Sequence, residues 1–320
     1  MSFLLGAMDL NTTLGAVLVG GLVSIALWGM TCVQSYNFFM AKTKDGLALK
    51  LMVAFLWVLD TLDAVLTCHV LYYYCVSSFM DPLKIIVPTW SAVIHVATTC
   101  TITFIIRSMF LIRVYRLSKH NILITSIITL ISLASLVSGY MVTVEAFSFK
   151  TYFELSKISS VIYVALASGA ASDFSLAIVQ CILLYRSRTG FKRTNSLIST
   201  LMLYAINTGF VVMMDSSSVL ITYAVMPTNF IFLGLYLPTP KLYLNTYLAH
   251  LNARQSIQDQ LHRRSRPGFS HSYALNQTSQ TVPWNSIPGD VIAISVDKVV
   301  EQSKNDSDST SPSVSQNKGY

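Results

Sequence analysis

Seven long apolar stretches between residues 12 and 252 dominate this chain, and the connectors between them alternate between basic and nearly neutral. About 20 apolar residues can cross a bilayer as a helix, because a helix satisfies its own backbone hydrogen bonds where water is absent. The spans are predicted at residues 12–41, 47–77, 85–114, 121–148, 157–186, 196–225 and 229–252. The expected fold is therefore all-α, a polytopic seven-transmembrane helix bundle.

The composition excludes an ordinary water-soluble domain. Only 12% of the residues are charged and 53% are hydrophobic, whereas soluble domains contain about 25% charged residues. The protein is expected to be a multi-pass membrane protein, in either the plasma membrane or an endomembrane. The net charge of +7 is assigned to membrane orientation and contact with the lipid bilayer. No basic run is interleaved with aromatic residues, so no nucleic acid is expected as a partner.

Basic residues gather in alternate connectors. The first, third and fifth connectors and the stretch after the last span contain Lys42, Lys44, Lys50, Arg113, Arg116, Lys119, Arg186, Arg188, Lys192, Arg193, Arg254, Arg263, Arg264 and Arg266. The other connectors contain Lys84, Lys150 and Lys157. Because cytosolic loops are enriched in Lys and Arg, the N-terminus (1–11) is predicted outside and the C-terminus in the cytosol.

Two boundaries near the C-terminus depend on proline and on polar composition. The sixth span could end near Met214, with the seventh starting at Ser218. A long sixth helix that ends before Met226 is favoured, because Pro227 disfavours helix at the residue before it. Residues 253–320 are rich in Ser, Thr, Asn, Gln and Pro, so they are predicted to form a disordered cytosolic tail.

Several short blocks occur in order along the chain. They are LDTL at 59–62, HVLYYY at 69–74, TWS at 89–91, RVYRLS at 113–118, RSRTGFKR at 186–193, LYAINTG at 203–209, LY at 242–243 and LNAR at 251–254. Together they resemble a group of basidiomycete (mushroom-type fungal) seven-transmembrane proteins that share a domain of unknown function, from residue 12 to about residue 256. The resemblance implies seven spans and no particular activity. In that group a histidine often follows the LDTL block, where this chain has Asp63.

Ionisable residues inside the predicted spans are the main functional candidates, because burying a charge in a membrane is costly. Asp60 and Asp63 are three residues apart and share one helical face, and Asp173 and Lys241 lie at a similar depth. Asn207 adds an amide. One hypothesis is a midplane cluster of these charged residues that binds a ligand, a proton or sodium. The alternative is a static network that orients the helices. Arg107 is expected to lock span three to another helix.

Lys241 lies in span seven, where light-driven pumps carry the lysine that binds retinal. Pro238 and Pro240 crowd this position, and no acidic residue precedes it within the span. A simpler prediction is that Lys241 pairs with Asp173 or reaches toward the cytosolic interface.

The sequence does not favour an enzyme. His69 and His95 are weak candidates for zinc ligands, but no third intramembrane histidine appears in spans four to seven, since His250 is expected on the cytosolic side. No nucleophile elbow or phosphate-binding loop is present, so no catalytic residue and no cofactor are expected. An intramembrane metal-dependent enzyme is thus the least favoured hypothesis.

The first hypothesis is a receptor-like sensor with a small-molecule pocket in the outer half of the bundle. Its predicted cytosolic basic face consists of Arg113, Arg116, Arg186, Arg188, Lys192 and Arg193. This face could dock acidic lipids or a cytosolic signalling partner, or serve orientation alone. The second hypothesis is a small transporter or channel that uses the midplane carboxylates, although internal repeats, which many transporters show, are absent.

Overall fold

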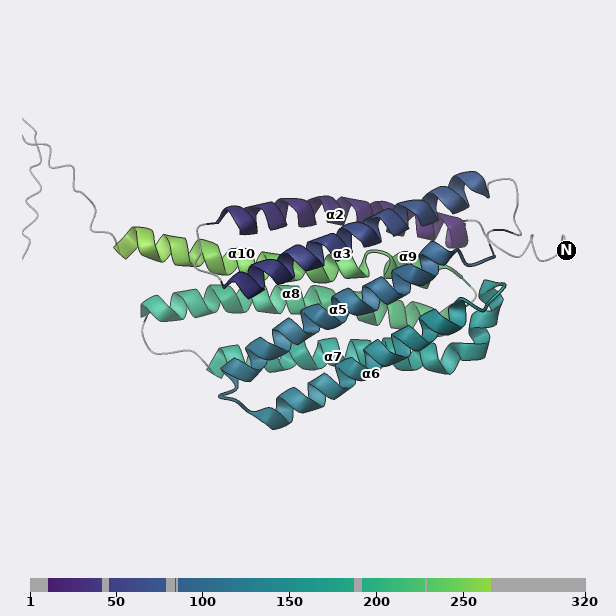
Figure 1. Ribbon diagram of the computed structural model, residues 1–320. Coiled ribbons are helices and arrows are strands. Elements are labelled where there is room, and N and C mark those ends of the chain that lie inside the picture. The colour runs from purple at the N-terminus through teal and green to yellow at the C-terminus, as the bar shows by residue number, and fades with distance from the viewer. Residues whose placement is uncertain are drawn as a thin grey trace, which may run out of the picture. The chain divides into compact units, whose positions relative to one another are not determined.

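The structure is a computed structural model that describes residues 11–41, 46–78, 84, 86–186, 192–227 and 229–265, with the backbone alone for 11, 153, 184, 192–208 and 255–265. The described chain is all-α (Figure 1). Its elements are η1 (Asn11–Gly15), α2 (Ala16–Met40), α3 (Leu47–Tyr72), η2 (Tyr73–Ser77), α5 (Trp90–Leu117), α6 (Ile122–Ala146), η3 (Tyr152–Ile158), α7 (Ser159–Arg186), α8 (Lys192–Val225), α9 (Ile231–Tyr236) and α10 (Thr239–Ser265). Here η1 and η2 are π-helical turns and η3 is a 3-10 helix.

Five of the described helical segments are long and apolar enough to cross a membrane. They are Thr12–Met40, Leu47–Ser77, Trp90–Leu117, Ile122–Ala146 and Glu154–Leu183. Large apolar side chains cover their outer faces; Val19, Leu130 and Val144 are each more than 60% exposed. Such surface is stable against lipid tails and unstable in water. The chain is therefore a multi-pass membrane protein that associates with the lipid bilayer.

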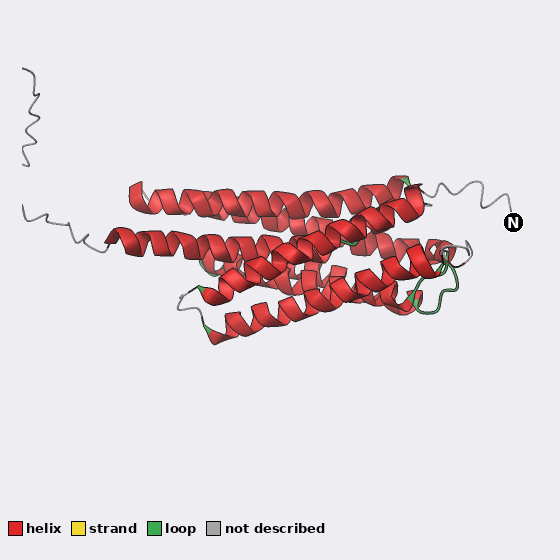
Figure 2. Ribbon diagram, turned by 90° about the horizontal axis from the view of Figure 1, so that it is seen from above, coloured by secondary structure: helices red, strands yellow, loops and turns green. Residues whose placement is uncertain are grey.

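Helices that follow one another in the chain pack side by side, from α2 to α8 (Figures 1 and 2). Helix α10 packs against both α2 and α8 and so closes the ring. Helix α5 contacts α7 and α10 as well as its sequence neighbours, which places it near the centre of the bundle. Figure 1 shows that α2 starts and α10 terminates at opposite ends of the bundle.

The third span begins later than predicted, at Trp90 instead of residue 85. Pro88 disfavours helix at the residue before it, and the Thr89 hydroxyl accepts a hydrogen bond from the backbone N–H of Ala92 at 3.3 Å. This N-cap fixes the start of α5. The helix then continues to Leu117, past the predicted end at residue 114.

The seventh predicted span is two helices, not one. The long sixth helix is confirmed, since α8 ends at Val225. After it, α9 ends at Tyr236, and α10 starts at Thr239 with Pro240 in its first turn, where a missing N–H costs no helical bond. Helix α10 also runs to Ser265, beyond the predicted tail boundary at 252. Residues 266–320 of the predicted tail lie outside the described residues.

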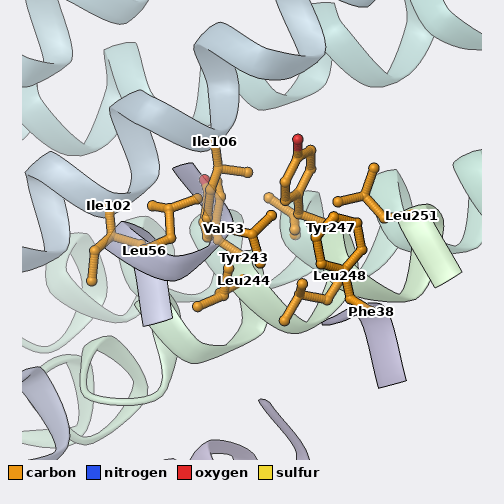
Figure 3. Packing of buried hydrophobic residues seen from close by; sticks show 11 residues of the cluster. Phe38, Val53, Leu56, Ile102, Ile106, Tyr243, Leu244, Tyr247, Leu248 and Leu251 are labelled. Carbon is orange, nitrogen blue, oxygen red and sulfur yellow. The ribbon is translucent and has the colours of Figure 1, made fainter. Parts of the chain in front are cut away.

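A buried apolar cluster holds α10 against α2, α3 and α5 (Figure 3). Leu244, Leu248 and Leu251 recur at helical spacing on α10, and they pack against residues such as Leu56 and Ile106. In lipid this contact is stabilised mainly by dispersion, because lipid tails are as apolar as leucine. The cluster lies beside both groups of buried charges described below.

Two glycines allow α2 and α9 to approach closely. A Cβ atom at Gly20 would lie 1.9 Å from the carbonyl oxygen of Gly234, so no larger side chain fits without a backbone shift.

Gly20→Ala is therefore expected to lower the free energy of unfolding by about 1–3 kcal/mol. Gly29→Ala on the same helix is the matched control, because a Cβ atom there would meet no other atom within 4 Å. Thermal unfolding in detergent checks this; equal Tm values for the two variants would contradict it.

Candidate functional site

A buried lysine joins the two predicted carboxylates of α3. Lys241 Nζ on α10 hydrogen-bonds to the Asp63 carboxylate, and it lies 3.5 Å from Asp60 Oδ1. It also donates to the Asp60 backbone carbonyl at 3.3 Å. All three side chains have 0% exposure. The expected proximity of Asp60, Asp63 and Lys241 is thus present in the structure, and the ion pairs explain how such burial is tolerated.

His95 on α5 completes this group, here called the lysine cluster (Asp60, Asp63, His95 and Lys241). Its Nδ1 lies 2.8 Å from Asp63 Oδ1, and its Nε2 lies 3.5 Å from the Thr99 hydroxyl. Asp60 is held less tightly than Asp63: Lys241 Nζ lies 3.5 Å from its Oδ1, and Thr31 is its other side-chain partner. With both carboxylates ionised and His95 neutral, the cluster carries one excess negative charge. A single proton, on His95 or Asp60, would balance it.

A second group of buried charges, here called the arginine cluster, consists of Arg107, Asp173, Ser216 and Tyr243. Arg107 on α5 binds Asp173 on α7 in bidentate fashion, with Nε–Oδ1 2.8 Å and Nη2–Oδ2 2.9 Å. Such fork-to-fork geometry gives the strongest kind of ion pair. The Tyr243 hydroxyl on α10 accepts from Arg107 Nη2 at 2.7 Å and donates to Asp173. The Ser216 hydroxyl on α8 lies 2.9 Å from Asp173 Oδ2.

The predicted pairing of Lys241 with Asp173 is wrong. Asp173 pairs with Arg107, and Lys241 is fully buried against α3 instead of reaching the interface. Residues two apart on a helix point about 200° apart, so Lys241 and Tyr243 face opposite sides of α10. The single midplane cluster of the sequence prediction is therefore two clusters, joined through α10. The expectation that Arg107 locks span three to another helix is confirmed, since it ties α5 to α7 and α10.

Of the two weak zinc candidates, His95 belongs to the lysine cluster and His69 makes other contacts. His69 Nδ1 lies 2.8 Å from the Ser91 hydroxyl, near the start of α5, and its ring packs against Trp90. Across the described residues, no three His, Cys, Asp or Glu side chains lie together as a metal ion would require. Asn207 lies in the part of α8 whose side chains are not described.

The predicted basic face comprises Arg113, Arg116, Arg186, Arg188, Lys192 and Arg193. The first three lie in the last turns of α5 and α7, at the bundle end where α10 terminates (Figure 1). Arg188 lies outside the described residues, and the side chains of the last two are not described.

Sequence reasoning missed Asp215 and Tyr243. Asp215 on α8 has a carboxylate oxygen that is buried without a hydrogen-bond partner among the described residues. Asp215 lies within the predicted sixth span, so it was as much a functional candidate as the other carboxylates inside the spans. Tyr243 gave no comparable signal, since a tyrosine in an apolar span is ordinarily packing.

A cavity of about 160 Å³ lies on the arginine cluster. Its floor contains Thr103, Arg107, Ser135, Ser216 and Tyr243. Its walls are mostly apolar and include Ala92, Val96, Val142, Ile162, Leu166, Val219 and Phe232. Tyr236 also lines it and packs edge-on against His95, with ring centroids 5.9 Å apart, so one side chain contacts both the cavity and the lysine cluster.

The far end of the cavity is lined by Pro88, Tyr152 and Leu155. The Tyr152 hydroxyl lies 2.9 Å from that of Tyr74, and its backbone N–H donates to the carbonyl of Ile86 at 2.8 Å. Burial raises the pKa of Tyr152 well above its usual value, so this hydroxyl stays neutral at physiological pH. These bonds hold η3 over the end of the bundle where α2 starts (Figure 1).

Comparison with known proteins gives one similarity. No curated protein and no solved structure matches this chain. Residues 169–256 match DUF6534, a family of unknown function. The matched segment contains Asp173, Ser216, Lys241 and Tyr243, so it supplies residues to both clusters, while their partners on α3 and α5 lie outside it.

Proposed function

We propose that this protein is a receptor-like sensor with seven spans, whose cavity binds a small molecule. Five spans are the long apolar segments. In this proposal the sixth span is α8, which contains the apolar stretch Gly209–Val225, and the seventh is the broken pair α9 and α10. The observation that carries the proposal is the cavity itself. An apolar space with a few convergent polar groups is the usual form of a small-molecule site.

The distribution of charge supports an extracellular position for the cavity. Arg113, Arg116, Lys119 and Arg186 all lie at the end of the bundle opposite η3. By the positive-inside rule that end is cytosolic, which puts the start of α2 outside. The cavity then occupies the extracellular half, and Arg107 forms its floor near the middle of the membrane.

The connections of the floor explain how binding could be sensed. Arg107 contacts α7 and α10, and both α5 and α10 continue from it to the proposed cytosolic end. A ligand that contacts Arg107 more favourably in one packing of these helices shifts the equilibrium toward that packing. The break between α9 and α10 lies at the same level, since Tyr236 and Thr239 both line the cavity. The basic face is the proposed docking surface for a cytosolic partner.

Filling the cavity tests this proposal. Ala165 lines the cavity, whereas Ala167 on the same helix is exposed to lipid. Compounds from a small-molecule library that raise the Tm of the wild type are expected to raise that of Ala167→Leu equally and to leave Ala165→Leu unchanged. Equal shifts in both variants would place binding elsewhere and remove the basis of the proposal.

One observation favours a second candidate, proton-coupled or sodium-coupled transport. The lysine cluster contains one carboxylate more than its fixed cation can balance, and Lys241 hydrogen-bonds to Asp63 while it lies 3.5 Å from Asp60. If this carboxylate carries a transported cation, proteoliposomes should show a proton or sodium flux that Asp60→Asn abolishes. A static cluster predicts the same flux as empty liposomes, and that result would exclude transport by Asp60.

A further inference from the structure

We infer that the ligand of this cavity is a neutral, mostly apolar molecule with a single hydrogen-bond-accepting oxygen, which contacts Nη1 of Arg107. The inference rests on the proposed function, because it assigns a chemical class to the same site.

One donor group of Arg107, Nη1, is not fully used by the described residues. A guanidinium carries one hydrogen on Nε and two on each Nη nitrogen. Nε binds Asp173, and Nη2 faces Asp173, Tyr243 and the Gly169 carbonyl, the last at 3.3 Å. Nη1 has a single long contact among the described residues, 3.5 Å to the Ser135 hydroxyl. At least one of its two hydrogens therefore remains for an acceptor in the cavity.

The acceptor must be neutral. The charge of Arg107 is already balanced by Asp173, so a carboxylate or phosphate would bring an uncompensated charge into a buried site. An amine on the ligand would find no free acceptor on Asp173. The two oxygens of Asp173 already face Arg107 Nε, Arg107 Nη2, the Tyr243 hydroxyl and the Ser216 hydroxyl. A carbonyl, ester or alcohol oxygen satisfies Nη1 without adding charge.

The remaining space fits a hydrocarbon body. One water needs about 10–15 Å³ of cavity volume, so the cavity of about 160 Å³ holds on the order of ten non-hydrogen atoms. Val96, Ile162 and Phe232 line it away from the floor and offer no hydrogen bonds from their side chains. Medium-chain ketones, aldehydes, esters and alcohols combine this size with one polar oxygen.

A series of nine-carbon probes tests the chemical class. Binding of 2-nonanone, nonane, nonanoate and nonylamine is measured by calorimetry on the full-length protein in nanodiscs, with empty nanodiscs to subtract partition into lipid. We expect 2-nonanone to bind at least tenfold more tightly than nonane, because a hydrogen bond to a charged donor contributes that much. The two charged probes are expected to bind more weakly than 2-nonanone. Tighter binding of any other probe would overturn the assignment.

Two further measurements locate the contact. Arg107→Lys keeps a cation beside Asp173 but removes Nη1, so it is expected to abolish the preference for 2-nonanone over nonane. Because this variant could also fail to fold, the carbonyl stretch of bound 2-nonanone is measured in the wild type and in Ser135→Ala. A shift to lower frequency in both proteins is expected, since Nη1 is retained in both. A band at its position in hydrocarbon solvent would contradict the contact with Arg107.

The cavity variants separate this inference from the proposed function. If Ala165→Leu loses binding of every probe but 2-nonanone shows no preference, the ligand class is wrong and the cavity remains a binding site. If Ala165→Leu and Ala167→Leu bind all four probes as the wild type does, the proposed function fails together with the inference.

Discussion

Replacing Lys241 by Met is expected to lower the free energy of unfolding by about 3–5 kcal/mol, the usual cost of breaking a buried ion pair. Met fills a similar volume but leaves Asp60 and Asp63 buried without their shared cation. Protonation of the carboxylates removes this charge, so the loss is expected to be larger at pH 8 than at pH 5. Denaturant unfolding in mixed micelles at the two pH values measures both effects.

Asp60→Asn is the matched control for this prediction. With His95 neutral, it removes the negative charge for which the lysine cluster has no fixed cation, while Lys241 keeps its bond to Asp63. The variant is expected to be as stable as the wild type or more stable. A loss as large as that of Lys241→Met would show that the charge count of the lysine cluster is wrong.

Asp173→Asn is expected to have a comparable effect, about 3–5 kcal/mol, because it leaves the buried Arg107 guanidinium without a counter-ion. The hydrogen bonds from Tyr243 and Ser216 lose their charged acceptor at the same time. Unfolding of the purified protein in mixed micelles measures this loss.

A double replacement tests whether the uncompensated charge is the cause. Arg107→Met combined with Asp173→Leu removes both charges and is expected to recover most of the stability, since apolar residues often replace a buried ion pair at little cost. If the double variant is less stable than Asp173→Asn, hydrogen bonding and shape, and not charge balance, dominate the arginine cluster.

The face that two residues of one helix share could be predicted from the sequence, but the rotation of each helix toward its neighbours could not. Spacing along one helix correctly put Asp60 and Asp63 on a common face. The partner of Asp173 depended on how α5, α7 and α10 turn toward one another, and no local pattern encodes that. Equal depth therefore suggested Lys241, whereas the structure pairs Asp173 with Arg107.

Local chemistry also explains which boundaries were predictable. Pro227 indicated the end of α8 correctly, because its effect acts on the preceding residue. Pro238 and Pro240 lie beside Lys241 in the sequence, but they did not predict the break between α9 and α10. The cavity had no sequence signature at all, since its lining comes from η3 and from six helices, α5 to α10, whose mutual packing no local pattern encodes.

The two clusters meet on a short part of α10. Lys241 and Tyr243 belong to its first turns and hold opposite sides of the helix, one toward α3 and the other toward α5 and α7. The cavity touches Tyr243 directly and reaches His95 through Tyr236. The cavity and the lysine cluster thus both contact the same segment of α10.

A density map of the protein in nanodiscs with a bromine-labelled 2-nonanone tests the ligand site most directly. We predict bromine density inside the cavity, with the carbonyl oxygen about 2.7–3.2 Å from Arg107 Nη1. Bromine density confined to the lipid-facing surface, with the cavity unchanged, would contradict the account.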